Sequence, residues 1–170
     1  MFGFFHPDFY FEKYDDITPE FLDQNGIKTL LLDVDNTLAP YEQAEPNEKN
    51  LKWFKALDDA KISYAFISNN SSGERIKRFN ASIGAPAFAK SGKPFANKNI
   101  GKALATLGVE KGNVAIVGDQ IFTDILAGKF SGVRTILVPP IKDKKNLFFR
   151  FKRALEKPVL KEYFKKHRKR

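Results

Sequence analysis

A chain of 170 residues, 42% of them hydrophobic, has the size and composition of one compact domain with a single buried core. It contains no cysteine, which excludes disulfides, thiolate metal sites and cysteine-nucleophile chemistry. No apolar run approaches the ~20 residues of a membrane-spanning helix, and the N-terminal sequence lacks the pattern of a secretory signal. We therefore predict a cytoplasmic protein in which carboxylates carry any chemistry.

The formal net charge of +9 is distributed unevenly along the chain. Residues 142–170 contain 13 Lys or Arg and three acids, which gives +10 for this segment and −1 for the preceding 141 residues. A near-neutral body with a basic tail favours an anionic partner surface, and nucleic acid and anionic lipid are equally open on this evidence. We divide the chain into a domain with an aromatic N-terminal segment, residues 1–141, and a basic, aromatic C-terminal tail, residues 142–170.

The first predicted elements lie between residues 17 and 34. Residues 1–16 are dense in aromatic side chains without a clear period and receive no assignment. Thr18 and Pro19 predict a helix start, and Gly26 predicts its end. The apolar run from Thr29 to Val34 then predicts a strand that is buried on both faces of a parallel sheet.

Helices and strands alternate through the rest of the domain. Strands are predicted at 64–67, 114–117 and 135–138, with a short extended piece at 87–89 and a helix over 120–130. The second of the other three helices opens with a capping box at Ser71 and Glu74, and the third runs from near Pro94 to Gly108. This order predicts a three-layer α/β/α fold with a central, mainly parallel sheet and right-handed crossovers. The inward residues of the three helices are Leu51, Phe54 and Leu57; Ile76, Phe79 and Ile83; and Ile100, Leu104 and Leu107.

Reactive residue types gather where the predicted strands end, which is where ligands bind in folds of this kind. Each of them alone is more often a turn, a cap or a solvated side chain. Together, at one edge of one sheet, they favour a catalytic site. They are Asp33 and Asp35 after the first strand, Ser68 and Asn69 after the second, Lys93 before the following helix, and Asp119 with Asp124 after the fourth.

The pattern resembles the haloacid dehalogenase superfamily of phosphatases over roughly Lys28 to Pro140. The motifs of that superfamily are Asp-x-Asp-x-Thr, a Ser or Thr, a Lys, and Gly-Asp-x-x-x-x-Asp, and all occur here in order. The resemblance implies a Mg²⁺-dependent phosphate monoester hydrolase in which Asp33 forms an aspartyl-phosphate. Asp35 would act as general acid and then as general base, and Thr37 would orient the catalytic loop.

The resemblance also implies the ligands of the metal and of the phosphate. Mg²⁺ would take oxygen ligands from Asp33, Asp35 and Asp119, with Asp124 orienting the metal or its waters. The transferred phosphoryl group would be bound by Ser68, the amide of Asn69 and the ammonium of Lys93.

The intervals in which superfamily members insert cap domains are short here. About ten residues separate Thr37 from the next helix, and one helix with a short extended piece fills the interval from Ser68 to Lys93. We expect no large cap and an active site open to a macromolecule or to a headgroup still held in a membrane.

The segment Gly26–Leu38 and the aromatic start also resemble the YqeG-type branch of subfamily IIIA, which is related to the mitochondrial-type phosphatidylglycerophosphatases. This implies dephosphorylation of phosphatidylglycerophosphate in phospholipid biosynthesis, on the inner face of a membrane. The tail supports peripheral contact with anionic lipid, because it mixes basic residues with Leu147, Phe148, Phe149, Phe151 and Leu155.

Three alternatives stay open. The aromatic residues could instead pack on the body or at a subunit interface, and Pro158 argues against one long amphipathic helix in the tail. A soluble phosphatase for nucleotides or sugar phosphates would share the same motifs. The basic run Lys165–Arg170 would also suit a non-catalytic RNA- or ribosome-associated module, although no RNA-binding signature accompanies it. The sequence leaves the oligomeric state open.

Overall fold

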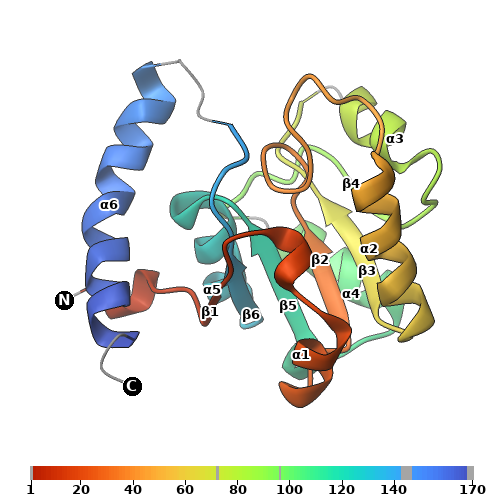
Figure 1. Cartoon of the computed structure of the whole chain (residues 1–170), viewed down its shortest axis with the longest axis horizontal. Helices are drawn as coiled ribbons and strands as arrows, with labels where there is room; N and C mark the ends of the chain where they lie inside the picture. Colours follow the sequence, from red (N-terminus) through yellow and green to blue (C-terminus); the bar gives the residue numbers. More distant parts are fainter. Residues whose placement is uncertain (1, 72, 96, 143–146, 168–170) are drawn as a thin grey trace.

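The computed structural model describes residues 2–71, 73–95, 97–142 and 147–167. Within these ranges the chain forms a six-stranded sheet in the order β1-β6-β5-β2-β3-β4, and all neighbouring strands are parallel (Figure 1). The strands are β1 (Phe9–Tyr10), β2 (Thr29–Leu32), β3 (Ser63–Ile67), β4 (Ala87–Phe88), β5 (Val114–Gly118) and β6 (Arg134–Leu137).

Helices cover both faces of this sheet. They are α1 (Pro19–Gln24), α2 (Glu48–Asp59), α3 (Glu74–Asn80), α4 (Asn97–Leu107), α5 (Leu126–Ser131) and α6 (Leu147–His167). Short 3₁₀ turns lie at η1 (Gly3–Phe5), η2 (Tyr14–Asp16) and η3 (Lys111–Asn113), and a π-helical turn, η4 (Ile121–Ile125), precedes α5. The predicted α/β fold with a parallel central sheet is confirmed.

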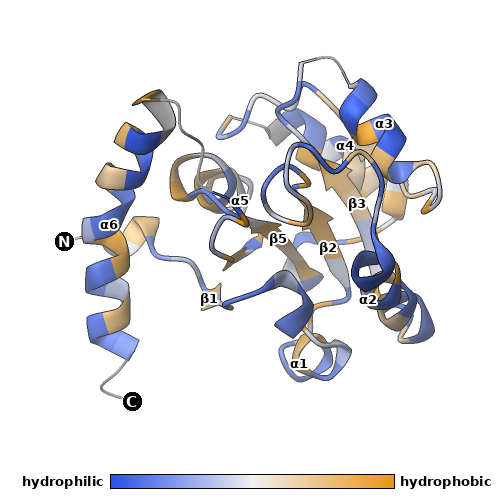
Figure 2. Cartoon of the chain, turned by 45° about the horizontal axis from the view of Figure 1, so that its top comes forward, coloured by the Kyte–Doolittle hydropathy of each residue, from blue (hydrophilic) through white to orange (hydrophobic). Residues whose placement is uncertain are grey.

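Alternate residues of the strands enter two separate cores. In β2, Leu30 and Leu32 join the core beneath α1, α2 and α3, whereas Leu31 joins the core beneath α4 and α5. Figure 2 shows the hydrophobic colour concentrated on β2, β3 and β5. A strand that is buried on both faces must be apolar at every position, which is why these strands read as continuous apolar runs.

The inward face of α2 differs from the predicted one. Leu51 is 43% exposed, so its predicted core position was wrong, whereas Phe54 and Leu57 are buried as expected. The inward position is taken by Asn50, whose side-chain amide donates to the Tyr14 hydroxyl at 2.8 Å and to the Leu38 carbonyl at 2.9 Å. A buried amide with its hydrogen bonds made can replace an apolar side chain at such a position.

The start of α3 also differs from the prediction. Gly73, in the left-handed region at φ 71°, is the N-cap and supplies no side-chain hydrogen bond, so the capping box predicted from Ser71 and Glu74 was wrong. The helix ends at Asn80, before Ile83, which packs against the core from the following turn. The next helix, α4, begins at Asn97 rather than near Pro94, because residues 92–95 form a turn closed by a hydrogen bond from the Phe95 amide to the Gly92 carbonyl.

The C-terminal helix is continuous through Pro158, so the predicted interruption there was wrong. Val159 and Tyr163 are buried on one side of this proline, and Glu156 is buried on the other. Because both halves of the helix are packed against the body, tertiary contacts compensate for the backbone hydrogen bond that proline removes. Figure 1 shows α6 standing along the β1 edge of the sheet, beside the N-terminal segment.

The aromatic N-terminal segment packs between α6 and the sheet. Strand β1 pairs with β6, and Phe2, Phe5 and Tyr10 pack on a cluster that includes Val159 of α6 and Leu137. Helices within the described ranges are all too short or too polar to cross a membrane.

Candidate active site

The carboxyl ends of β2 and β5 and the segment that follows β4 bring acidic and basic side chains together. The Lys93 ammonium lies 2.7 Å from Oδ1 of Asp33 and 2.5 Å from Oδ1 of Asp124. The Thr37 hydroxyl donates to Oδ2 of Asp33 at 3.0 Å and approaches Oδ1 of Asp119 at 3.3 Å. Five residues predicted from three separate motifs thus form one hydrogen-bonded group.

Three of these residues form a compact cluster of buried carboxylates. Asp33, Asp119 and Asp124 are 7%, 2% and 1% exposed, and each offers one oxygen within 4.8 Å of the others. A cluster of this kind could hold a metal ion. Carboxylate oxygens are the ligands that hard divalent cations such as Mg²⁺ prefer.

Local backbone geometry fixes the position of Asp124. Its Oδ2 atom accepts hydrogen bonds from the Gln120 amide at 3.1 Å and from the Thr123 hydroxyl at 3.3 Å. The π-helical turn η4 thereby folds Asp124 back over the end of β5. Gly118 makes room for it, since a Cβ at this position would lie 2.2 Å from Cγ of Asp124.

The pKa values follow from burial and from the crowding of negative charge. Burial, together with the charges of Asp124 and Asp119, raises the pKa of Asp33 to about 8, against the opposing effect of Lys93. Burial and Asp124 raise the pKa of Asp119 to about 6, and Arg153 opposes this shift. Burial alone would lower the pKa of Lys93, but Asp124 and Asp33 raise it, so the lysine stays charged. Ionisation of all three carboxylates is thus unfavourable in the crowded cluster, and a divalent cation held there would relieve the repulsion.

Ser68 and Asn69 follow β3 and line the same pocket. The Ser68 hydroxyl oxygen accepts the Asn70 amide at 3.1 Å. The side chain of Asn69 makes two hydrogen bonds with the backbone of Lys93. Its Oδ1 accepts a hydrogen bond from the Lys93 amide at 2.8 Å, and its Nδ2 donates one to the Lys93 carbonyl at 3.1 Å. The pocket has a volume of about 310 Å³ and is also lined by Tyr41 and by Lys152 of α6.

Asp35 lines this pocket but stands apart from the carboxylate cluster. Its Oδ1 atom is 2.8 Å from Nε of Arg75, and Nδ2 of Asn70 donates to its Oδ2 at 3.4 Å. Arg75 also donates to the backbone carbonyls of Pro40 and Gln43. The side chain of Asp35 thus belongs to a separate ion pair at the rim of the site.

Sequence reasoning missed two arginines and one glutamate at this site. Arg75 binds Asp35, as described above. Arg153 of α6 forms an ion pair with Asp119 and also donates to its backbone carbonyl. Glu156 pairs with Arg153 at 2.9 Å and accepts the Ile121 amide at 2.7 Å. The basic tail is therefore not a free appendage over this stretch, because it contacts the carboxylate cluster directly.

Comparison with known proteins shows the family to which this chain belongs. The family model described as mitochondrial PGP phosphatase matches residues 3–142. The chain belongs to this phosphatase family. A Bacillus subtilis relative, described as probable phosphatase YqeG, is 32% identical over 157 residues, which cover 92% of this chain and 90% of the relative. The phosphatidylglycerophosphate phosphatase 1 of Arabidopsis thaliana is 30% identical over 162 residues, covering 86% of this chain and 44% of that protein.

Solved structures share the fold of this phosphatase. The cobalt-bound deoxy-D-mannose-octulosonate 8-phosphate phosphatase of Haemophilus influenzae superposes with a TM-score of 0.52 at 21% identity, over 67% of this chain and 69% of that one. A magnesium-bound phosphatase domain from Bacteroides fragilis gives a TM-score of 0.53 at 18% identity, over 81% of this chain and 43% of that one. This chain is an enzyme, a phosphatase of the haloacid dehalogenase type.

Proposed function

We propose that this phosphatase hydrolyses a phosphate monoester with Mg²⁺, through an aspartyl-phosphate formed on Asp33. The observation that carries the proposal is that Asp33 contacts the Lys93 ammonium and lies beside two further buried carboxylates. In this arrangement a nucleophilic oxygen, a phosphate-binding cation and the ligands of a metal meet at one point. The contacts of each side chain support a separate role.

The ligands of the cation would be Asp33, Asp119 and Asp124, with the backbone carbonyl of Asp35 as a further oxygen. When bound, Mg²⁺ would neutralise the repulsion between the Asp33 carboxylate and an incoming phosphate. The close approach of three buried carboxylates, which raises the pKa of Asp33, supports this assignment.

The first chemical step transfers the phosphoryl group to Asp33. A carboxylate oxygen of Asp33 attacks phosphorus, the bond from phosphorus to the leaving oxygen breaks, and Asp35 donates a proton to that oxygen. The hydrogen bond from Thr37 to Oδ2 fixes the orientation of the attacking carboxylate.

The second step returns the enzyme to its starting state. Asp35, now ionised, takes a proton from water as the water oxygen attacks the phosphorus of the aspartyl-phosphate, and inorganic phosphate leaves. Ser68, the amide of Asn69 and Lys93 bind the phosphoryl oxygens in both steps. Lys93 is suited to this because Asn69 holds its backbone from both sides.

We further propose that the substrate is phosphatidylglycerophosphate, dephosphorylated at the cytoplasmic face of a membrane. Support comes from the family and from the outer face of α6. Leu147, Phe151 and Leu155 recur every fourth residue on this helix and are 79%, 62% and 48% exposed. Arg150 and Lys152 lie between them in the sequence, so the helix combines apolar and basic groups as interfacial helices do.

The test is phosphate release from phosphatidylglycerophosphate in anionic vesicles, with and without Mg²⁺. We expect release that needs Mg²⁺ and falls to the detection limit in Asp33→Asn, whereas Asp59→Asn, an exposed change on α2, keeps wild-type activity. Full activity of Asp33→Asn would refute the assignment of Asp33 as the nucleophile. Turnover of nucleotides or sugar phosphates without turnover of the lipid would refute the proposed lipid substrate but not the proposed aspartyl-phosphate mechanism.

A further inference from the structure

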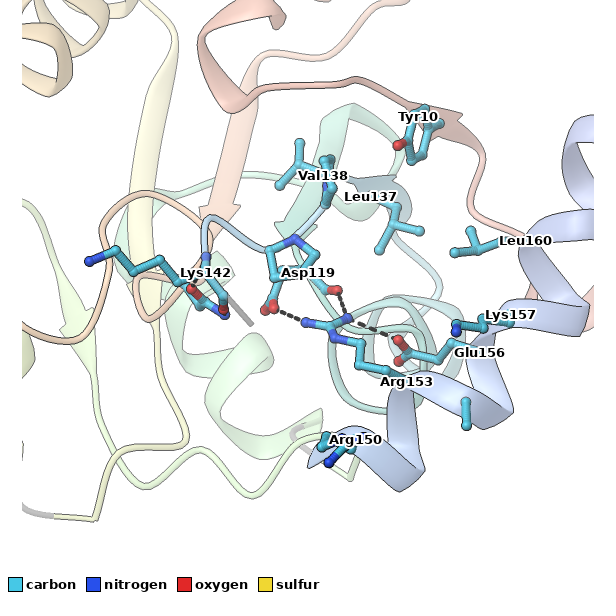
Figure 3. A pocket seen from close by; sticks show the side chains of 14 residues that line it. Tyr10, Asp119, Leu137, Val138, Lys142, Arg150, Arg153, Glu156, Lys157 and Leu160 are labelled. Atoms are coloured by element: carbon cyan, nitrogen blue, oxygen red, sulfur yellow. Dashed lines mark hydrogen bonds and ion pairs between the residues drawn. The ribbon is translucent and has the colours of Figure 1, made fainter. Parts of the chain in front are cut away.

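A second cavity, of about 700 Å³, lies between α6 and the end of β6 (Figure 3). Its volume falls within the range of roughly 300–1,000 Å³ that is typical of small-molecule sites. Asp119 is the one catalytic-site carboxylate among its lining residues. We call this cavity the α6–β6 groove.

The two sides of the groove differ in chemistry. Figure 3 shows Tyr10, Leu137 and Leu160 together on one side. These three side chains belong to one hydrophobic cluster, so this side is apolar. On the other side, Arg153 contacts Asp119, and Arg150 lies beyond Arg153 in the same view. The groove therefore has an apolar side and a charged side.

Positive charge exceeds negative charge in the groove. Arg153 is neutralised by Asp119 and Glu156. Within the described part of the chain, Arg150 and Lys157 have no carboxylate partner, and both line the groove. Unpaired cations beside an apolar wall are complementary to a ligand that carries an anion and a hydrocarbon chain.

The groove adjoins the catalytic pocket. The side chain of Asp119 lines the groove and is also part of the carboxylate cluster. On α6, Lys152 lines the catalytic pocket, while its neighbours Arg153 and Ala154 line the groove. Consecutive residues of α6 therefore line the two cavities.

We infer that the α6–β6 groove binds the lipid part of an anionic phospholipid substrate, which rests on the proposed function. One acyl chain lies against Tyr10, Leu137 and Leu160. The phosphodiester lies near Arg150 and Lys157, and the terminal phosphomonoester reaches Asp33. The groove thus makes the enzyme recognise the lipid itself, in addition to any attraction of α6 to the bilayer surface.

The experiment measures kcat/KM for a series of monomeric substrates below the concentration at which they form micelles. The series has the phosphatidylglycerophosphate headgroup with no chains, and with butanoyl, hexanoyl or octanoyl chains. We expect kcat/KM to rise with chain length by up to about fourfold for each methylene that enters the groove, and then to level off. This series needs no variant.

A variant that fills the groove gives a second test. Ala154 is exposed on α6 and lines the groove, so Ala154→Trp adds bulk there without removing a core contact. We expect it to abolish the dependence on chain length. Ala105→Trp, at an exposed position of α4, should keep the wild-type dependence. Thermal unfolding of both variants checks that they fold.

The outcomes separate the two proposals. Equal kcat/KM for all monomeric members, with acceleration only when vesicles are present, would overturn the groove and leave the lipid substrate intact. The same conclusion would follow if a folded Ala154→Trp variant kept the full dependence on chain length. If no member of the series were hydrolysed while other monoesters were, the proposed lipid substrate would fail, and the groove proposal with it.

Discussion

The carboxylate cluster depends on the absence of a side chain at Gly118. A Cβ there would lie 2.2 Å from Cγ and 2.4 Å from Oδ2 of Asp124, distances that no real contact reaches. Asp124 would have to move, and its 2.5 Å contact with Lys93 would be lost. Glycine is therefore needed at position 118 to leave space for Asp124, and not to allow a left-handed backbone conformation.

Gly118→Ala should lower kcat/KM by about tenfold or more, because it displaces Asp124, which is both a proposed metal ligand and a partner of Lys93. The Mg²⁺ concentration for half-maximal activity should rise as well, which a titration of activity with Mg²⁺ measures. Gly112→Ala is the matched control, since a Cβ there meets nothing within 4 Å. Wild-type activity in Gly118→Ala would contradict the placement of Asp124.

Arg75 is a positioning residue for Asp35. Its guanidinium joins Asp35 to the carbonyls of Pro40 and Gln43, so it fixes the carboxylate relative to the loop that follows β2. Proton transfer by a well-placed acid contributes typically about 10²–10⁴ to a rate. Misplacing Asp35 should therefore cost a large part of this factor.

We predict that Arg75→Met lowers kcat/KM for an alkyl phosphate by about tenfold or more. The loss should be much smaller for 4-nitrophenyl phosphate, whose leaving group needs no proton. A purely structural role would lower both activities equally. Arg78→Met, one turn along on the exposed side of α3, is the control and should change neither activity.

Individual residues of the site were predictable to different degrees. The strand-end residues could be placed near one another from the sequence, because parallel strands in one sheet end at the same edge. Arg75 and Arg153 could not, because a single arginine on a helix carries no periodic signal and only tertiary packing decides which carboxylate it meets. Asn69 was predicted as a site residue through its backbone amide, but the hydrogen bonds of its side chain to the backbone of Lys93 could not be predicted, because they too depend on tertiary packing.

At the scale of elements, the order of strands and helices followed from apolar periodicity, and the errors lay where packing overrides local preference. Asn50 takes an inward position on α2 because Tyr14 and Leu38 satisfy its amide. Helix α6 continues through Pro158 because both of its halves are anchored to the body. In both cases the stabilising contacts come from other parts of the chain, so the local sequence does not predict them.

Close packing of α5 on the sheet gives a prediction at this scale. A Cβ on Gly128 would lie 2.4 Å from Cγ2 of Thr135 and 2.6 Å from Cγ2 of Ile116. Gly128→Ala should therefore destabilise the protein by about 1–3 kcal/mol, the usual cost of overpacking. Gly101→Ala, on α4 in open space, should instead stabilise it by roughly 0.5–1 kcal/mol. Denaturant unfolding measures both, and equal effects would refute the close contact.

For the whole molecule, the question is whether α6 belongs to the same cooperative unit as the sheet. Val159 is buried in a cluster with Ile121, Ile125 and Leu137, which ties the helix to the segment carrying Asp124. Arg153 and Glu156 add polar contacts to Asp119 and Ile121. The helix and the carboxylate cluster should therefore unfold together.

Val159→Ala tests this coupling. The loss of buried methyl groups and the cavity left behind should cost about 2 kcal/mol, and the Tm of a single unfolding transition should fall by roughly 4–8 °C. Leu155→Ala, on the exposed side of the same helix, should leave Tm within about 1 °C. If α6 were an independent appendage, Val159→Ala would leave the main transition unchanged and produce a separate early one. Because Arg153 reaches Asp119 from this helix, Val159→Ala should lose phosphatase activity over the same temperature range in which the sheet unfolds, and activity and unfolding measured on the same samples test this.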